Sequence, residues 1–346
     1  MNLGKKGAYL NTGIPGTGLY DRHRLDKPER NVGNNRNHEN LGAPQSSERD
    51  LSEYFFMGDK KEIESGPVSG LTSPGLEKLK EELIACHEQF HELESKLSTQ
   101  KAVYRFCYLI EILSYIMVFG FFWKKAKEIR IEQQSKMDDL SALLGLTKIK
   151  VDLNADEKVI DAYLKLRDKY ELLAQSHEIW DVTSTAKIDR AKTRSAAGTA
   201  ITPKPVRFTF KSIDYLDMDC KPIHLQNANG GDLYLYPGFL VVYISKTNFA
   251  LIELHDLELD FSSTLFIEES TVPKDAIIHS HTWTKVNKDG SRDKRFKDNR
   301  QIPVCKYGKL TLFSKKGLNE EYMISSFEKT QMFYESFLAF RKTYTL

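Results

Sequence analysis

An apolar stretch in the first half of the chain constrains its fold more than any other feature. Residues 106–123 read FCYLIEILSYIMVFGFFW, and Glu111 is the only charged residue among them. As an α-helix this stretch is about 27 Å long, close to the thickness of a bilayer core. A cationic run follows directly, as on the cytoplasmic side of membrane segments: Lys124, Lys125, Lys127 and Arg130.

Three structures fit the apolar stretch. The first is a transmembrane helix, and the second is a helix that inserts shallowly into a membrane surface. The third is a soluble helix buried among others, or a helical hairpin broken at Gly120, because Glu111 at membrane depth costs about 2.5–3.5 kcal/mol. If the stretch contacts lipid, we expect the contacting residues to be Phe106, Leu109, Ile110, Leu113, Ile116, Phe119, Phe122 and Trp123.

A heptad repeat precedes the apolar stretch. Its apolar positions alternate at spacings of three and four: Leu76, Leu79, Leu83, Cys86, Phe90, Leu93 and Leu97. This spacing is typical of a coiled-coil seam with polar residues at the other positions. We expect residues 76–97 to pair either with residues 124–144 in a hairpin or with a second copy of the chain.

The rest of the N-terminal half divides by composition. Residues 1–20 hold five glycines among short apolar pairs, a pattern that predicts tight β-hairpins. Residues 21–74 have too few apolar residues to offset their ordering entropy, so we predict a disordered linker. A further amphipathic helix is predicted over 152–176, which makes 75–180 a helical middle region.

Hydrophobic periodicity changes from helical to alternating after Ile201. Seven or eight short antiparallel strands are predicted, separated by Gly-rich and Asn-rich turns. A helix from about Asn319 to Lys342 follows, and we expect its Phe327, Phe333 and Phe337 to face the strands. This order predicts an α+β chain: a helical, coiled-coil middle region, then a PH-like (pleckstrin-homology-like) antiparallel β-barrel with a C-terminal helix in residues 200–346.

Two parts of the sequence resemble bacterial proteins of a known type. Residues 10–20, LNTGIPGTGLY, resemble the end of a glycine-rich domain, domain of unknown function number 4236, which is truncated in this chain. Four longer motifs resemble a C-terminal module of proteins that often carry this domain: residues 176–184, 189–195, 227–239 and 283–319. The resemblance implies a shared family without a known activity. Arg292 departs from the usual pattern, which has proline there.

The strongest local charge lies in residues 285–316, where eleven cationic and three acidic residues give +8. We predict that seven of these cations bind an anionic surface: Lys285, Lys288, Arg292, Lys294, Arg295, Lys297 and Arg300. The alternatives are a protein partner, or a solvated hairpin pinned by pairing of Asp293 with Arg295. Arg190 and Arg194 are predicted to lock neighbouring modules through carboxylates, a structural role.

Several function classes find no support. Fifty basic and 48 acidic residues leave a net charge of +2, so the chain is not broadly basic like many nucleic-acid-binding proteins. Four scattered cysteines indicate a reducing compartment, and the first residues lack the apolar core of a signal peptide. His279 and His281 lack further metal ligands, and Cys220, His224, His255 and Cys305 are candidates only if the fold gathers them, so we predict no metal or cofactor. No G-x-S-x-G, Walker A or H-E-x-x-H motif is present, which disfavours an enzyme.

Together these patterns favour a non-enzymatic protein of the bacterial cytoplasm that is attached to the inner membrane or acts as a scaffold. Its barrel would bind an anionic lipid surface or a protein partner, and its heptad seam a second copy. The alternative is a soluble stress or phage-defence effector or sensor whose barrel binds nucleic acid or protein. Nucleic acid is the less favoured of these partners.

Overall fold

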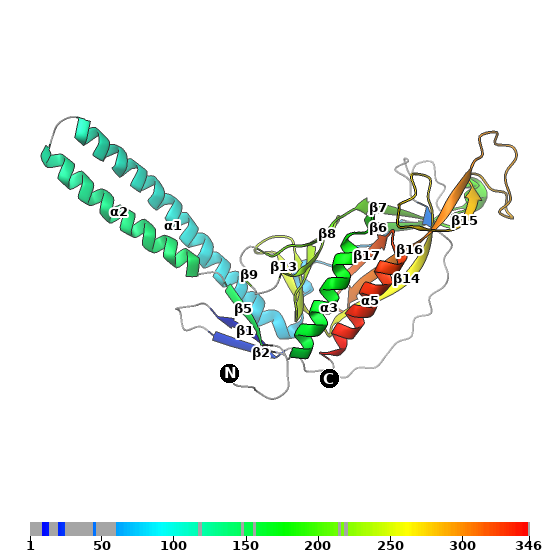
Figure 1. Cartoon of the computed structure of the whole chain (residues 1–346), viewed down its shortest axis with the longest axis horizontal. Coiled ribbons are helices and arrows are strands. Elements are labelled where there is room, and N and C mark those ends of the chain that lie inside the picture. Colours follow the sequence, from blue (N-terminus) through cyan, green and yellow to red (C-terminus); the bar gives the residue numbers. More distant parts are fainter. Residues whose placement is uncertain are drawn as a thin grey trace.

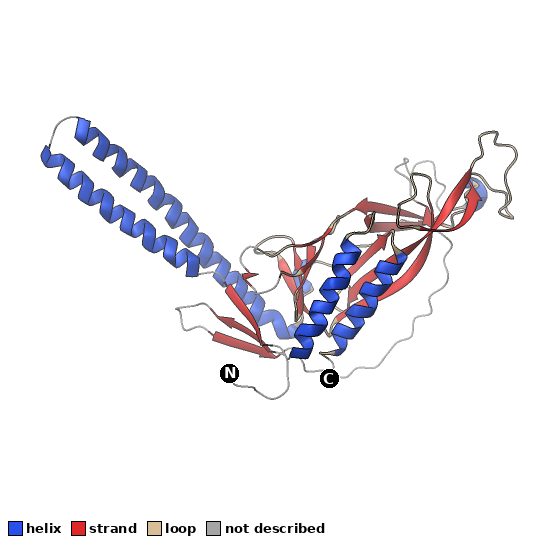
Figure 2. Ribbon diagram, viewed as in Figure 1, coloured by secondary structure: helices blue, strands red, loops and turns tan. Residues whose placement is uncertain are grey.

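A helical hairpin projects from a body of β-sheets, two further long helices and one short helix (Figure 1). The structure, a computed structural model, describes residues 9–13, 20–24, 44–45, 60–116, 120–146, 149–154, 157–213, 216–217 and 221–344. Figure 2 shows the two long hairpin helices extending away from the strands of the body.

The hairpin consists of α1 (Glu77–Ile116) and α2 (Gly120–Leu146). The two helices run side by side, and the Gln100 side-chain amide donates to Gln133 Oε1 at 2.8 Å. The apolar stretch 106–123 is thus divided between two helices, which confirms the alternative of a hairpin broken near Gly120. Within the described residues, neither these helices nor any other is long and apolar enough to cross a bilayer.

The heptad seam has two partners rather than one. Leu76, Leu79 and Leu83 are buried in the same core cluster as Leu251 of the body. Leu97 is buried further along α1, next to the part that pairs with α2. The root of α1 is therefore a component of the body, and the pairing with α2 uses the distal part of the helix.

Three sheets make up the β-structure. An antiparallel sheet has the order β13-β12-β11-β10-β8. Its strands are β8 (Phe208–Phe210), β10 (Ile223–Leu225), β11 (Asp232–Leu235), β12 (Phe239–Tyr243) and β13 (Phe249–Glu253). A small sheet combines β1 (Tyr9–Gly13), β2 (Tyr20–Arg24), β5 (Ile149–Asn154) and β9 (Leu216–Asp217). Strands β1 and β2 pair antiparallel, but β2 lies almost entirely within residues 21–74, which the sequence predicts to be a disordered linker.

The largest sheet is built around β16 (Gln301–Ser314), which pairs along both edges. Its partners are β14 (Leu257–Ile267) on one edge and β15 (Ile277–Trp283) and β17 (Asn319–Ile324) on the other. From β17 the sheet continues to β6 (Ile179–Lys187) and β7 (Thr199–Pro205). The short β4 (Lys61–Glu62) pairs with β6, and β3 (Pro44–Gln45) pairs with β7 and, at one residue, with β14.

The α+β class and the C-terminal helix are confirmed, whereas the single closed barrel is wrong. The described strands after residue 200 divide among all three sheets: β9 belongs to the small sheet, and the others to the five-stranded sheet or the large sheet. Strand β13 is buried at all five positions, so both of its faces are covered. The PH-like character of the body is not established by this arrangement.

Two helices lie side by side against the sheets: α3 (Glu157–Ala174) and α5 (Phe327–Lys342). Helix α5 begins later than predicted, because residues 319–324 alternate in polarity and form β17. Ser326 caps the helix by accepting a hydrogen bond from the Lys329 backbone. Phe333 and Phe337 are buried as predicted, and the Phe327 ring lies 5.3 Å from that of Phe261.

Residues 60–76 lie against the body, although the sequence analysis assigned residues up to 74 to a linker. Ile63, Val68 and Leu71 are buried there. The Ser73 backbone donates to Leu251 O at 2.8 Å. This segment includes two turns of 3-10 helix, η2 (Val68–Gly70) and η3 (Pro74–Leu76), and leads directly into α1. A few well-spaced apolar residues are enough to hold it because a body surface is available to cover them.

Candidate functional site: the hairpin tip and a basic loop

Near the tip, the seam between the two helices holds an ion pair together with aromatic, small and polar side chains rather than a purely apolar core. The α1 positions that are half-buried against α2 are Tyr104, Cys107, Glu111 and Ser114. Arg130 of α2 donates to the Glu111 carboxylate, and the two side chains are only 19% and 14% exposed. This contact raises the pKa of the Arg130 guanidinium. An ion pair therefore occupies the position where a soluble hairpin usually places apolar side chains.

The outer surface of distal α1 is apolar. Phe106 is 64% exposed, Leu113 59% and Ile116 65%. Further exposed apolar and aromatic side chains on the same segment are Val103, Tyr108, Leu109, Ile110, Ile112 and Tyr115. We call these nine exposed residues the apolar face of α1. A soluble hairpin places such residues inside and charges outside, so this part of the molecule has the inverted polarity.

The predicted lipid-contacting residues mostly lie on this face. Phe106, Leu109, Ile110, Leu113 and Ile116 are all exposed. Trp123 is half-buried near Tyr115, with their ring centroids 6.4 Å apart. Phe119 lies outside the described residues, as does the side chain of Phe122.

The first turns of α2 add positive charge beside the apolar face. Lys124, Lys125 and Lys127 are exposed there, and Lys127 Nζ lies 5.4 Å from the Trp123 ring centroid. The hairpin tip therefore combines apolar side chains on α1 with lysines on α2. This combination is typical of helices that lie in the interface of an anionic membrane.

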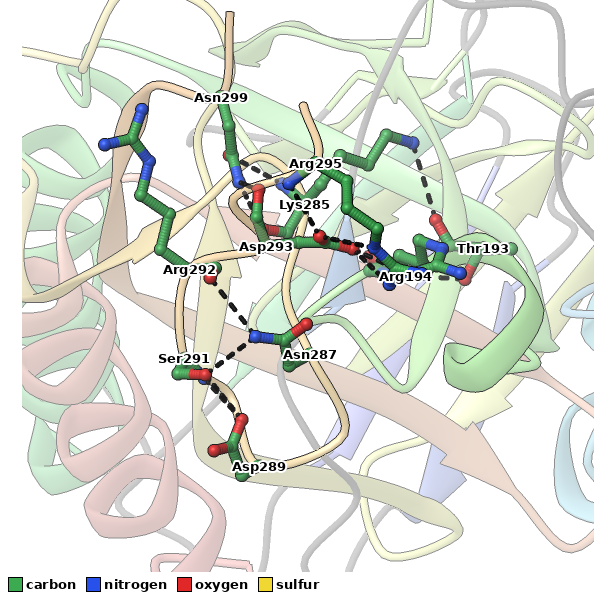
Figure 3. A network of polar contacts seen from close by, with 11 residues as sticks. Thr193, Arg194, Lys285, Asn287, Asp289, Ser291, Arg292, Asp293, Arg295 and Asn299 are labelled. Atoms are coloured by element: carbon green, nitrogen blue, oxygen red, sulfur yellow. Dashed lines mark hydrogen bonds and ion pairs between the residues drawn. The ribbon is translucent and has the colours of Figure 1, made fainter. Parts of the chain in front are cut away.

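The basic loop, residues 284–300 between β15 and β16, is organised around one buried acid (Figure 3). Asp293 is 1% exposed and accepts hydrogen bonds from two arginines. Arg194 Nη1 lies 2.6 Å from Asp293 Oδ2, and Arg295 binds both carboxylate oxygens, at 2.9 and 2.8 Å. Asn299 closes the loop because its side-chain amide donates to the backbone oxygens of Lys285 and Asp293.

The loop is also tied to the segment before β7. The Val286 backbone donates to Arg194 O at 2.8 Å, and Lys285 Nζ donates to Thr193 O at 3.4 Å. Arg194 has a left-handed backbone with φ 55°, where α4 (Arg190–Thr193) ends. The pairing of Asp293 with Arg295, which the sequence offers as the alternative to surface binding, is present. Arg194 contacts a carboxylate as predicted, whereas Arg190 has no ion pair within the described part of the chain.

The seven cations predicted to bind an anionic surface therefore divide into four that make contacts within the protein and three that are exposed without an ion pair. Lys285 and Arg295 hold the loop together, as described above. Arg292 lies 4.8 Å from the Trp283 ring centroid, and Arg300 donates to Glu269 O at 3.3 Å. Lys288, Lys294 and Lys297 are exposed, and no ion pair of theirs occurs within the described part of the chain. These three lysines are the best placed to meet an anionic partner.

Two buried acids were not singled out by the sequence analysis. Asp181 of β6 accepts from the Ala228 backbone at 2.8 Å, and Glu320 of β17 accepts from the Ser65 hydroxyl. Burial raises the pKa of Asp181 to about 6 and that of Glu320 to about 7. The sequence pattern that could have identified them as buried is the alternation of the strand residues. Glu320, for example, lies two positions before the buried Tyr322 and so faces the same side of β17.

The histidine pair on β15 stays apart from other ligands. His279 and His281 are exposed, and the strand register shifts between Ile278 and Ser280. Among the described residues, the group of side chains close enough to share an ion lies elsewhere, at Glu253, His255 and Asp256. Of the candidates that sequence analysis made conditional on the fold, His255 alone belongs to this group.

Comparison with known proteins gives no match: no family model, curated protein or solved structure corresponds to this chain. The resemblance to the glycine-rich domain and its C-terminal module stays a prediction.

Proposed function

We propose that this protein is a non-enzymatic membrane-attachment protein whose hairpin tip lies in the interface of an anionic lipid surface. The observation that carries the proposal is the inverted polarity of the tip. Glu111 and Arg130 face each other between the helices, while Phe106 and Leu113 face outward. Interfacial attachment requires no helix that crosses the bilayer.

The energetics favour lipid as the cover of this surface. Transferring one large apolar side chain out of water contributes about 1.5–3 kcal/mol, so a few such residues exceed the threshold for stable attachment. Each lysine near an anionic leaflet adds about 1 kcal/mol. Lys124, Lys125 and Lys127 are placed to reach the head groups when the apolar face of α1 is in the acyl boundary.

The body would then act at a distance from the attachment point. The hairpin tip and β15 lie at opposite ends of the molecule (Figure 1). Lys288, Lys294 and Lys297 of the basic loop are proposed as a second contact for anionic groups, whether lipid head groups or an acidic protein surface. A scaffold that holds one partner at a membrane fits this arrangement.

Vesicle flotation tests the attachment. The full chain is mixed with vesicles of phosphatidylcholine, with and without phosphatidylglycerol, and floated through a density gradient. We expect the wild-type protein to float with the anionic vesicles and less with neutral ones. Leu113→Asp should abolish flotation because it places a charge in the apolar face.

Leu143→Asp is the matched control, since Leu143 is similarly exposed on α2 but lies away from the tip. Its flotation should equal that of the wild type. If Leu113→Asp floats normally, or if the wild-type protein stays unbound and forms a stable oligomer that Leu113→Asp dissociates, the apolar face is covered by something other than lipid and the proposal fails.

A further inference from the structure

We infer that Glu253, His255 and Asp256 form a binding site for a divalent transition metal, with Zn²⁺ the best fit, at the foot of the helical hairpin. One ligand atom from each residue lies within 4.8 Å of the other two. The three residues come from the end of β13 and the turn before β14, where the Asp256 backbone donates to Glu253 O at 3.0 Å. A single tight turn thus gathers one imidazole and two carboxylates.

The His255 ring lies close to both carboxylates, and its Nε2 is 3.3 Å from Asp256 Oδ1. His255 Nδ1 lies 3.0 Å from Glu253 Oε2, yet this buried nitrogen makes no hydrogen bond. A hydrogen bond at that separation needs the N–H to point at the oxygen. Two ligands bound to one metal at about 2.1 Å are also roughly 3 Å apart, but both point at the ion between them.

The surrounding groups support metal binding. Ser73 Oγ donates to Asp256 Oδ2 at 2.5 Å and so fixes the orientation of that carboxylate, as outer hydrogen bonds do in metal sites. Glu253 is 8% exposed, so its carboxylate is largely removed from water. The two carboxylates and a neutral imidazole carry a charge of minus two, which a divalent cation neutralises.

The chemistry of the donors selects the metal class. Imidazole nitrogen together with carboxylate oxygen suits Zn²⁺, whereas Ca²⁺ and Mg²⁺ are bound by oxygen ligands alone. The half-buried His255 and Asp256 leave a path from solvent for the ion and for bound water. Three protein ligands with remaining positions for water complete a usual Zn²⁺ coordination sphere.

The position of the site links the metal to the hairpin. Ser73 also accepts a hydrogen bond from the Glu253 backbone at 3.0 Å and stands directly before η3 and α1. Gly75 packs so closely on Glu253 that a Cβ there would lie 2.1 Å from Oε1. A metal bound by Glu253 and Asp256 would therefore stabilise the junction from which α1 leaves the body.

Calorimetric titration of the full chain with ZnCl₂ tests the site, using protein purified without a histidine tag and stripped with a chelator. We expect the wild-type protein to bind Zn²⁺ and to melt at a higher temperature in its presence. His255→Ala should weaken this binding at least about tenfold and remove the thermal shift. Mg²⁺ at the same concentration should give neither effect.

His279→Ala is the matched control, because it removes an exposed histidine outside the site. It should bind Zn²⁺ as the wild type does. Asp256→Asn provides a second variant that keeps an oxygen for Ser73, and circular dichroism verifies that both variants fold. Absence of Zn²⁺ binding by the wild type, or equal affinity in the wild type and both site variants, would overturn the inference.

Discussion

The hairpin tip and the body bury opposite kinds of side chain. In the body, Phe337 and Tyr322 are 1% exposed. In the tip, Phe106 is 64% exposed, whereas the side chain of Glu111 is 14% exposed. Because apolar groups leave water on folding, the buried aromatic side chains give the body the usual polarity of a fold that is surrounded by water. The tip has the polarity of a structure whose surroundings are apolar, which is why its cover should be sought outside the chain.

The largest expected effect contrasts one phenylalanine from each region. Phe337→Ala should lower the free energy of unfolding by about 3–5 kcal/mol, because it leaves a cavity in the buried face of α5. Phe106→Ala should change it by less than about 0.5 kcal/mol, because the side chain has little contact to lose in water. Urea unfolding of the full chain measures both. Equal losses would show that Phe106 is packed in solution. The tip and the body would then not bury opposite kinds of side chain.

The pH dependence of stability should originate in the body. Burial raises the pKa of Asp181 and of Glu320, and the pKa values of Glu253 and Glu268 move in the same direction. An acid with a raised pKa binds more protons when folded than when unfolded, so its stabilising contribution is complete below about pH 4 and is lost as the pH rises toward about 7. Unfolding at pH 5 and pH 8 should therefore show lower stability at pH 8.

A single substitution should reduce that slope. Glu320→Gln removes a buried acid whose pKa is raised to about 7, and should remove about 2 kcal/mol of the difference in unfolding free energy between pH 5 and pH 8. Glu321→Gln is the control on the same strand, half-buried and paired with Lys309. An unchanged slope in Glu320→Gln would mean that this carboxylate is hydrated in solution.

Loss of Asp293, the buried acid of the basic loop, should lower the free energy of unfolding by an intermediate amount. Asp293→Ala removes the common acceptor of Arg194 and Arg295, and both guanidinium groups can still reach water. We expect a loss of about 1–3 kcal/mol and faster tryptic cleavage within residues 285–300. Lys294→Ala, next in the chain and exposed, should leave stability and cleavage at the remaining sites unchanged.

The sequence predicts local structure well where one periodicity dominates. The α3 stripe and the buried face of α5 follow directly from apolar spacing, whereas the hairpin break near Gly120 was one of several structures that the apolar stretch allowed. The start of α5 was misplaced although residues 319–324 alternate in polarity, because their pairing with β16 decides that they form a strand. The division of strands into separate sheets does not follow from spacing, because it depends on pairings between distant segments, such as that of β17 with β6. Partners such as Arg194 and Asp293 are likewise far apart in sequence, so their types suggest an ion pair without specifying it.

The inverted tip shows a different limit of sequence reasoning. Residues 106–123 indicate an apolar stretch, but only the pairing of α1 with α2 shows that Glu111 faces inward toward Arg130. The cluster at Glu253, His255 and Asp256 was equally hidden, since closely spaced acids and histidines are common in turns. Only the folded turn brings their side chains close enough to share an ion, and only the fold places Ser73 beside Asp256.

The smallest expected effect decides what the loop arginines do. Arg295 is a brace for Asp293, but its side chain is 65% exposed, so water screens the pair and Arg194 still neutralises the acid when Arg295 is lost. Arg295→Ala should therefore cost less than about 1 kcal/mol in urea unfolding and leave vesicle flotation unchanged. Lys297→Ala, its exposed neighbour, should cost nothing in stability. If instead Arg295→Ala weakens binding to anionic vesicles as strongly as Leu113→Asp while the fold stays intact, the body and not the tip makes the principal contact, and the roles assigned to the two regions are reversed.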